Sequence, residues 1–116
     1  MTSAGSRRAE SPLACDLAAI SVSDRPRYGE LRRMVAAAIT GKRELPNGIA
    51  AQIATERMAL EQLAEWIVFE RKCCPFFEFR IDIAPKSGPV WLSLTGPAGV
   101  KEFLVQAFAE TAISPN

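Results

Sequence analysis

The stretch ERKCCPFF, residues 70–77, places two of the chain's three cysteines side by side. Thiolate sulfur is the ligand that soft ions such as Hg(II), As(III), Cu(I) and Zn(II) prefer. If a helix runs through residue 73, then Glu70, Cys73 and Cys74 are related by three and four positions and share one helical face. The pattern predicts a thiol site in which Cys73 and Cys74 bind a thiophilic metal ion and Glu70 is the candidate acid.

A third sulfur is available from Cys15 in the segment LACDLAAI, residues 13–20. We expect Cys15 to join the pair if its segment lies beside the cysteine stretch. Three sulfurs without nitrogen suit trigonal Hg(II) or As(III) better than tetrahedral zinc, which would need a carboxylate from Glu70 or Asp16 as fourth ligand. The chain has no histidine, so a histidine-ligated metal or haem site is excluded within it.

The neighbours of the pair predict how it is held. Pro75 ends the helix, because proline donates no backbone hydrogen bond and disfavours helical geometry in the residue before it. Arg71 and Lys72 would help to stabilise a thiolate, whereas the negative end of the helix dipole would oppose it. Phe76 and Phe77 would limit the access of water to the sulfurs.

Structural interpretations of the same residues stay open. A free cysteine is often buried as a small hydrophobic side chain. Glu70 could pair with a basic neighbour such as Arg71 or Arg80. A disulfide between adjacent cysteines would be strained and easily reduced, and would act as a switch.

The elements that would position these residues follow from the hydrophobic pattern. Proline, glycine and capping residues supply the predicted ends, including Gly41 after the first helix and Thr55 before the second. The expected elements are a strand in 13–20, a helix over 26–39, a strand over 49–53, a helix over 55–73, a hairpin of strands at 76–83 and 90–95, and a last helix from Thr95 to about residue 108. We predict an α+β two-layer sandwich of order β-α-β-α-β-β-α, with a mainly antiparallel sheet and its helices on one face.

Length and composition predict a single domain over residues 12–112, with a disordered segment at 1–11 and a frayed tail at 113–116. The net charge of +1 and the 48% hydrophobic content indicate an ordinary globular protein. The nearly balanced charge argues against nucleic acid or an anionic membrane as partner. We expect a cytoplasmic protein that binds a metal ion or a thiol-reactive small molecule. If the protein forms an oligomer, we expect a homodimer.

Several short motifs together carry a resemblance. They are Leu13-Ala14-Cys15, Leu45-Pro46-Asn47-Gly48, Glu70-x-x-Cys73-Cys74-Pro75-Phe76 with Phe79, Gly88-Pro89-Val90-Trp91-Leu92 and Leu94-Thr95-Gly96-Pro97. The chain resembles a family of small uncharacterised bacterial proteins of about this length. A related, shorter cysteine-containing segment is fused to the DNA-binding domains of some mercury-resistance-type regulators. The resemblance implies a heavy-metal context, and because this chain lacks a helix-turn-helix segment, DNA contact does not carry over.

Three functions remain as hypotheses. The first is soft-metal or metalloid binding by Cys73 and Cys74, with or without Cys15, beside Glu70. The second is a thiol enzyme, either a reductase or an organometal lyase, in which Glu70 or Asp16 protonates the leaving carbon. The third is an interaction or dimerisation module whose cysteines are only packed.

Overall fold

The computed structural model describes residues 16–109, and side chains over residues 16–107. Within this range three α-helices and four strands follow two short 3₁₀ turns. Their bounds are η1 Leu17–Ala19, η2 Val22–Asp24, α2 Arg25–Ala38, β1 Ile39–Leu45, β2 Gly48–Ile53, α3 Leu60–Cys73, β3 Glu78–Ile83, β4 Val90–Thr95 and α4 Val100–Ala109.

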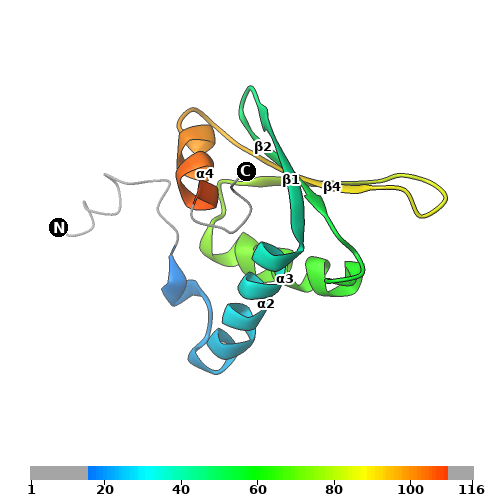
Figure 1. Ribbon diagram of the computed structural model, residues 1–116. Helices are drawn as coiled ribbons and strands as arrows, with labels where there is room; N and C mark the ends of the chain where they lie inside the picture. The colour runs from blue at the N-terminus through cyan, green and yellow to red at the C-terminus, as the bar shows by residue number, and fades with distance from the viewer. Residues whose placement is uncertain (1–15, 110–116) are drawn as a thin grey trace.

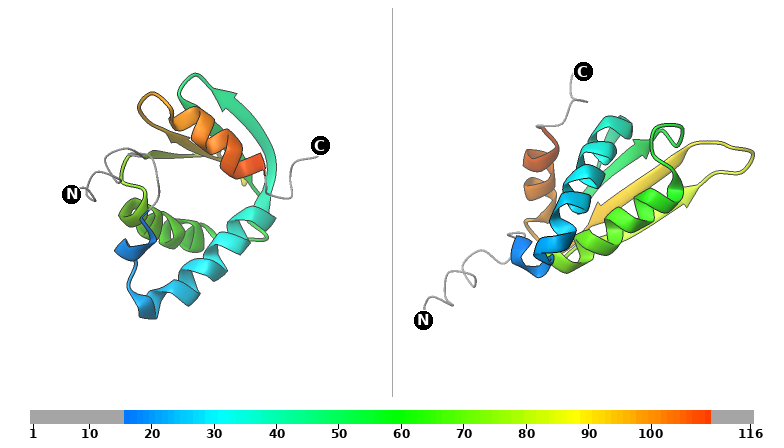
Figure 2. Two further views of the ribbon diagram at one scale, coloured as in Figure 1. Left: turned by 90° about the vertical axis from the view of Figure 1, so that its left-hand side faces the viewer. Right: turned by 90° about the horizontal axis from the view of Figure 1, so that it is seen from below.

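The four strands form one antiparallel sheet in the order β1-β2-β4-β3. The helices α2, α3 and α4 cover one face of this sheet, and the β3–β4 hairpin projects beyond them (Figures 1 and 2). This arrangement is a two-layer α+β fold, so the predicted fold class and the placement of the helices on one face are confirmed.

One strand comes from a different part of the chain than expected. The strand predicted in 13–20 is wrong over its described part, because residues 17–19 form a 3₁₀ turn that the Asp16 side chain caps. Residues 13–15 lie outside the described range. The fourth strand is instead β1, which pairs with β2 through the two-residue turn Pro46-Asn47. The described elements therefore run α-β-β-α-β-β-α.

Two predicted helix ends also differ. Gly41 does not cap α2; the helix ends at Ala38, and Gly41 lies in β1 next to a register shift of the β1–β2 pair. The second helix begins at Leu60 after Ala59, not at Thr55. Its end at Cys73 and the β3–β4 hairpin agree with the prediction.

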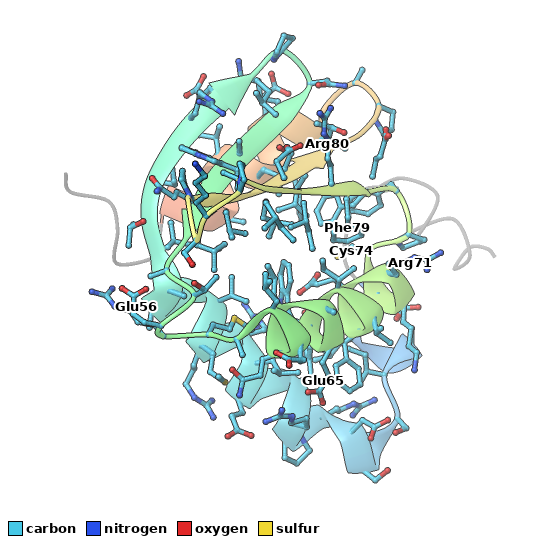
Figure 3. The ribbon with its side chains drawn as sticks, turned by 90° about the vertical axis from the view of Figure 1, so that its right-hand side faces the viewer. Glu56, Glu65, Arg71, Cys74, Phe79 and Arg80 are labelled. Carbon is cyan, nitrogen blue, oxygen red and sulfur yellow. The ribbon has the colours of Figure 1, made fainter. Side chains whose placement is uncertain are left out.

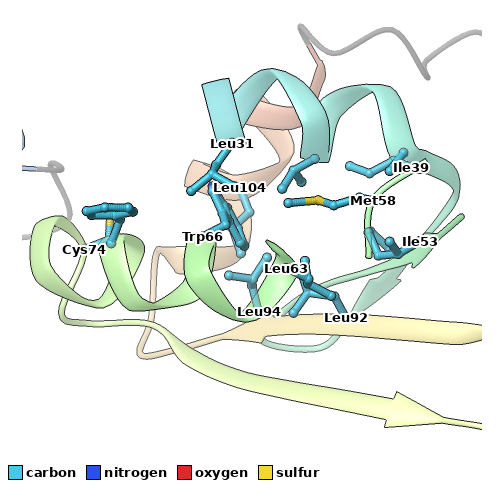
Figure 4. Packing of buried hydrophobic residues seen from close by; sticks show 14 of the residues in the cluster. Leu31, Ile39, Ile53, Met58, Leu63, Trp66, Cys74, Leu92, Leu94 and Leu104 are labelled. Carbon is cyan, nitrogen blue, oxygen red and sulfur yellow. The ribbon is translucent and has the colours of Figure 1, made fainter. Parts of the chain in front are cut away.

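The core lies between the sheet and the helices. Every second residue of a strand points into this core, because successive side chains of a strand point to opposite faces. Examples in β4 are Val90, Leu92 and Leu94. The helices contribute Leu31, Leu63 and Leu104, among others (Figure 4). Cys74 lies at the far end of α3 from the aliphatic residues around Met58 (Figure 4). The candidate site is thus at one end of the core and not at its centre.

Candidate metal and thiol site

The last two turns of α3 carry the predicted site. The buried face of this helix contains Leu63, Trp66, Glu70 and Cys73, spaced three and four positions apart as an amphipathic helix requires. Helical geometry stops at Cys74, whose backbone angles are φ −130° and ψ 70° and which is followed by Pro75. The helix end predicted from Pro75 is confirmed, and it leaves the two cysteines at the boundary between a helix and a loop.

The donor atoms of Glu70, Cys73 and Cys74 all lie within 4.8 Å of one another, and all three residues are buried. The Cys73 and Cys74 sulfurs are 3.7 Å apart, and Cys73 Sγ lies 3.9 Å from Glu70 Oε1. Such a cluster could hold a metal ion. Figure 3 shows Cys74 at the end of α3, facing the layer between the helix and the sheet.

The sulfur separation restricts the geometry of a shared ion. With metal–sulfur bonds of about 2.3 Å, a separation of 3.7 Å corresponds to an S–metal–S angle of about 107°. A linear two-coordinate ion would need sulfurs about 4.6 Å apart on the same bond length. The positions of the two sulfurs therefore fit a bent S–metal–S angle, as in an ion with three or four ligands.

The redox states of the two neighbours differ. Cys73 is a free thiol, whereas Cys74 is disulfide-bonded. The sulfur of Cys74 can thus act as a thiolate ligand only after reduction. Cys15, the predicted third ligand, lies outside the described residues.

Tyr28 is the residue of the site that the sequence did not reveal. Its hydroxyl donates a hydrogen bond of 2.7 Å to Glu70 Oε2 and lies 3.6 Å from Cys73 Sγ. Tyr28 belongs to the buried stripe of α2 with Leu31 and Val35, three and seven positions further on. That spacing could have placed Tyr28 in the core, but its contact with Glu70 depends on how α2 packs on α3.

Burial governs the ionisation of the site. It raises the pKa of Glu70 above its ordinary value, although the hydrogen bond from Tyr28 acts in the opposite direction. Burial likewise raises the pKa of the Cys73 thiol, opposed by its contact with Tyr28. The unloaded site therefore favours neutral groups, as expected where charge is poorly solvated.

The basic neighbours do not supply the expected thiolate stabilisation. Arg71 and Lys72 are exposed, and Lys72 Nζ lies 5.6 Å from the centre of the Phe69 ring. The alternative partner proposed for Glu70, Arg80, pairs with Asp82 at 3.2 Å. Glu70 is held by a neutral hydroxyl, and this favours its protonated form more than a salt bridge would.

Asp16 is not part of the donor cluster. Its carboxylate is exposed and accepts a hydrogen bond from the Ala18 N–H. The backbone N–H of Asp16, however, donates to the Cys73 carbonyl at 2.8 Å. The predicted role of Asp16 as a ligand or acid lacks support, whereas its backbone joins the N-terminal part of the described chain to the end of α3.

Three aromatic rings pack against the core cluster that contains Cys73 and Cys74. The Phe76 and Phe77 rings are 4.7 Å apart, and both contact the ring of Phe103 on α4. Cys73 and Cys74 are only 1% and 0% exposed. An ion can thus reach the sulfurs only if this end of the domain opens locally.

One more polar group lies on the same helical face. The Trp66 indole N–H, one turn before Glu70, is buried and has no hydrogen-bond partner within the described part of the chain. Buried donors are normally paired. Although it is outside hydrogen-bonding geometry, the indole N–H is directed at Glu70 closely enough to be one of the smaller effects that lower the pKa of that carboxyl.

Comparison of the chain with protein families, with characterised proteins and with solved structures finds no match. Within residues 16–109, no helix is long and apolar enough to cross a membrane. The resemblance described above stays a prediction.

Proposed function

We propose that the protein binds a soft metal or metalloid ion, of the Hg(II) or As(III) type, through the reduced sulfurs of Cys73 and Cys74. The observation that carries this proposal is the 3.7 Å separation of the two sulfurs beside Glu70. Adjacent residues in regular structure usually point in different directions. Here the helix end turns both sulfurs toward one position, as a shared ligand requires.

Cys15 is our proposed third ligand. It directly precedes Asp16, whose N–H is bonded to the Cys73 carbonyl. A third thiolate would complete the bent, sulfur-only coordination that the angle at the pair favours. The proposal for the pair does not depend on this third sulfur.

Because the groups of the free site are protonated, ion binding depends on pH. A thiol must lose its proton to bind the ion, so binding releases protons and tightens as pH rises. The buried thiol of Cys73, with its raised pKa, stays protonated and weakly nucleophilic until an ion is present. The free protein is therefore protected from indiscriminate thiol reactions.

The direct test is a titration of fully reduced protein with Hg(II) or with arsenite, followed by the thiolate-to-metal absorption band. We expect one ion per chain, with the band lost in the Cys73→Ser, Cys74→Ser double variant. Cys15→Ser, which removes one thiol outside the pair, is the matched control. An unchanged absorption band in this variant indicates a two-sulfur site, and a changed band indicates a three-sulfur site. Equal affinity in the wild type and the double variant would exclude the proposal.

Glu70 favours a second candidate, an organometal lyase with the metal alkyl as its substrate. In that reaction the two thiolates bind the metal, the carbon–metal bond breaks, and the carbon takes the proton of the Glu70 carboxyl while the metal ion stays on sulfur. The raised pKa of Glu70 keeps that proton in place at higher pH than usual. Turnover of an organomercurial that is lost in Glu70→Gln, with Hg(II) binding retained, would assign the lyase; binding without turnover assigns the first function.

A further inference from the structure

The strand β3 forms one edge of the sheet, and no other strand within residues 16–109 pairs with its outer side. Its exposed residues include Ile83, a large hydrophobic side chain that is 59% exposed. Open strand edges are templates for pairing with another chain.

The backbone hydrogen bonds determine which residues of β3 face outward. The Ala84 N–H donates to the Pro89 carbonyl, and this pair continues the register in which Ile83 lies opposite Val90. In an antiparallel pair, the N–H and C=O groups of alternate residues point to the same side. Even-numbered residues therefore bond to β4, and Phe79, Ile81 and Ile83 present their backbone groups at the open edge.

The side chains of β3 alternate in character between the two faces. Phe79 lies between the sheet and α3, and Arg80 lies on the opposite side of β3 from α3 (Figure 3). Glu78, Arg80 and Asp82 share that outer face and are all exposed. The strand thus carries an apolar row toward the helices and a row of alternating charge toward solvent.

We propose that β3 pairs antiparallel with β3 of a second copy of this chain, in a register centred on Ile81. Ile81 then lies opposite its own copy, and Phe79 lies opposite the partner's Ile83. On the outer face Arg80 lies opposite the partner's Asp82, and the reverse pair forms by symmetry. Both rows are self-complementary, and the sheet becomes continuous over eight strands, twice the four of one chain.

Neighbouring registers that keep the same backbone pairing are less favourable. A register centred on Arg80 places Arg80 opposite its own copy and Glu78 opposite the partner's Asp82, and like charges directly opposite are destabilising. A register centred on Asp82 brings the two Asp82 side chains together. A register centred on Phe79 pairs opposite charges but overlaps only the first half of β3. Charge complementarity and overlap together select Ile81 as the centre.

The other edge of the sheet is less suited to pairing. The β1 strand has a register shift between Ile39 and Gly41, and its Glu44 already pairs with Lys101 of α4. Irregularities of this kind are a device by which proteins protect sheet edges. The second copy is therefore assigned to β3.

Sedimentation velocity at concentrations from about 10 to about 500 µM tests the pairing, because small interfaces bind in this weak range. Wild-type protein should dimerise, and Arg80→Asp should weaken the dimer roughly tenfold or more, because it sets a second carboxylate opposite the partner's Asp82. The double exchange Arg80→Asp, Asp82→Arg restores opposite charges and should restore the dimer. Both positions are exposed, and circular dichroism of each variant verifies its fold.

Glu78→Arg is the matched control for the register. In the proposed register residue 78 faces no charged strand residue, so this variant should dimerise as the wild type does. A tighter dimer would indicate the register centred on Arg80, and a weaker one the register centred on Phe79; either overturns the assignment to Ile81. A monomeric wild type, or a dimer unchanged in Arg80→Asp, overturns the pairing itself.

Discussion

The Tyr28 hydroxyl on α2 donates a hydrogen bond to the Glu70 carboxyl on α3, with an oxygen–oxygen distance of 2.7 Å. This bond links the two helices inside the core, and the same hydroxyl lies 3.6 Å from the Cys73 sulfur. The acid and one thiol of the candidate site therefore share a single neutral partner.

Replacement of Glu70 by glutamine should change how stability depends on pH. Burial raises the pKa of Glu70 from its ordinary 4.5, so the folded state keeps a proton that the unfolded state loses first. The stabilising effect is complete below pH 4.5 and is lost as pH rises toward the folded pKa, by at most about 1.4 kcal/mol per pH unit for one proton.

Urea unfolding of both proteins between pH 4 and pH 8 measures this effect. Glu70→Gln has no ionisable group at this position, so it should gain stability relative to the wild type as pH rises. Curves that run parallel over the whole range would show that Glu70 ionises normally in the folded protein.

Replacement of Tyr28 by phenylalanine should destabilise the protein by about 1–3 kcal/mol at pH 8, because Glu70 loses its donor while it remains buried. The destabilisation by Tyr28→Phe should be smaller near pH 5, where more of Glu70 is protonated. A double-mutant cycle with Glu70→Leu, which has no acceptor for the Tyr28 hydroxyl, isolates the interaction from other effects of the lost hydroxyl. A coupling free energy near zero at pH 8 would mean that the bond does not stabilise the fold.

Native-state labelling should reveal how the buried sulfurs are reached. We expect Cys73 and Cys74 of reduced protein to react slowly with a thiol reagent, but faster than global unfolding allows, through local opening. Phe77→Ala should accelerate the reaction, since Phe77 packs against Phe76, Phe79 and Phe103. Val68→Ala, on the exposed side of α3, is the control and should leave the rate unchanged.

Peptide mapping by mass spectrometry assigns each labelled sulfur. Reaction of both cysteines only at the rate of global unfolding would favour the hypothesis that they are packed and have no chemistry.

The β1–β2 hairpin should depend on Gly48. A Cβ at this position would lie 1.9 Å from the Leu94 carbonyl oxygen, which is backbone and cannot rotate away. Gly48→Ala should therefore lower the free energy of unfolding by about 2 kcal/mol or more. A Cβ at Gly29 in α2 would make only ordinary van der Waals contact, 3.7 Å from Arg33 Nη1, so Gly29→Ala should instead stabilise by about 0.5–1 kcal/mol. Thermal unfolding of both variants checks the contrast, and a neutral Gly48→Ala would contradict the close approach of β2 and β4.

The local part of the site was predictable from sequence, because the spacing of Glu70 and Cys73 and the effect of Pro75 depend only on helical geometry. Tyr28 was not, since its role depends on the packing of α2 on α3. The β1 strand was missed for a related reason. Its sequence, ITGKREL, lacks clear alternation, and only its pairing with β2 makes it a strand. In 13–20 the alternation suggested a strand, but local capping by Asp16 gives a 3₁₀ turn over 17–19.

X-ray absorption spectroscopy of reduced protein loaded with one equivalent of Hg(II) or arsenite tests the central claim most directly, because it counts the sulfur atoms bound to the ion. Convergence of Cys73 and Cys74 predicts at least two sulfur neighbours per ion at a single site, reduced by one in Cys73→Ser and in Cys74→Ser. One sulfur per ion in the wild type, or a count unchanged in both variants, would contradict it.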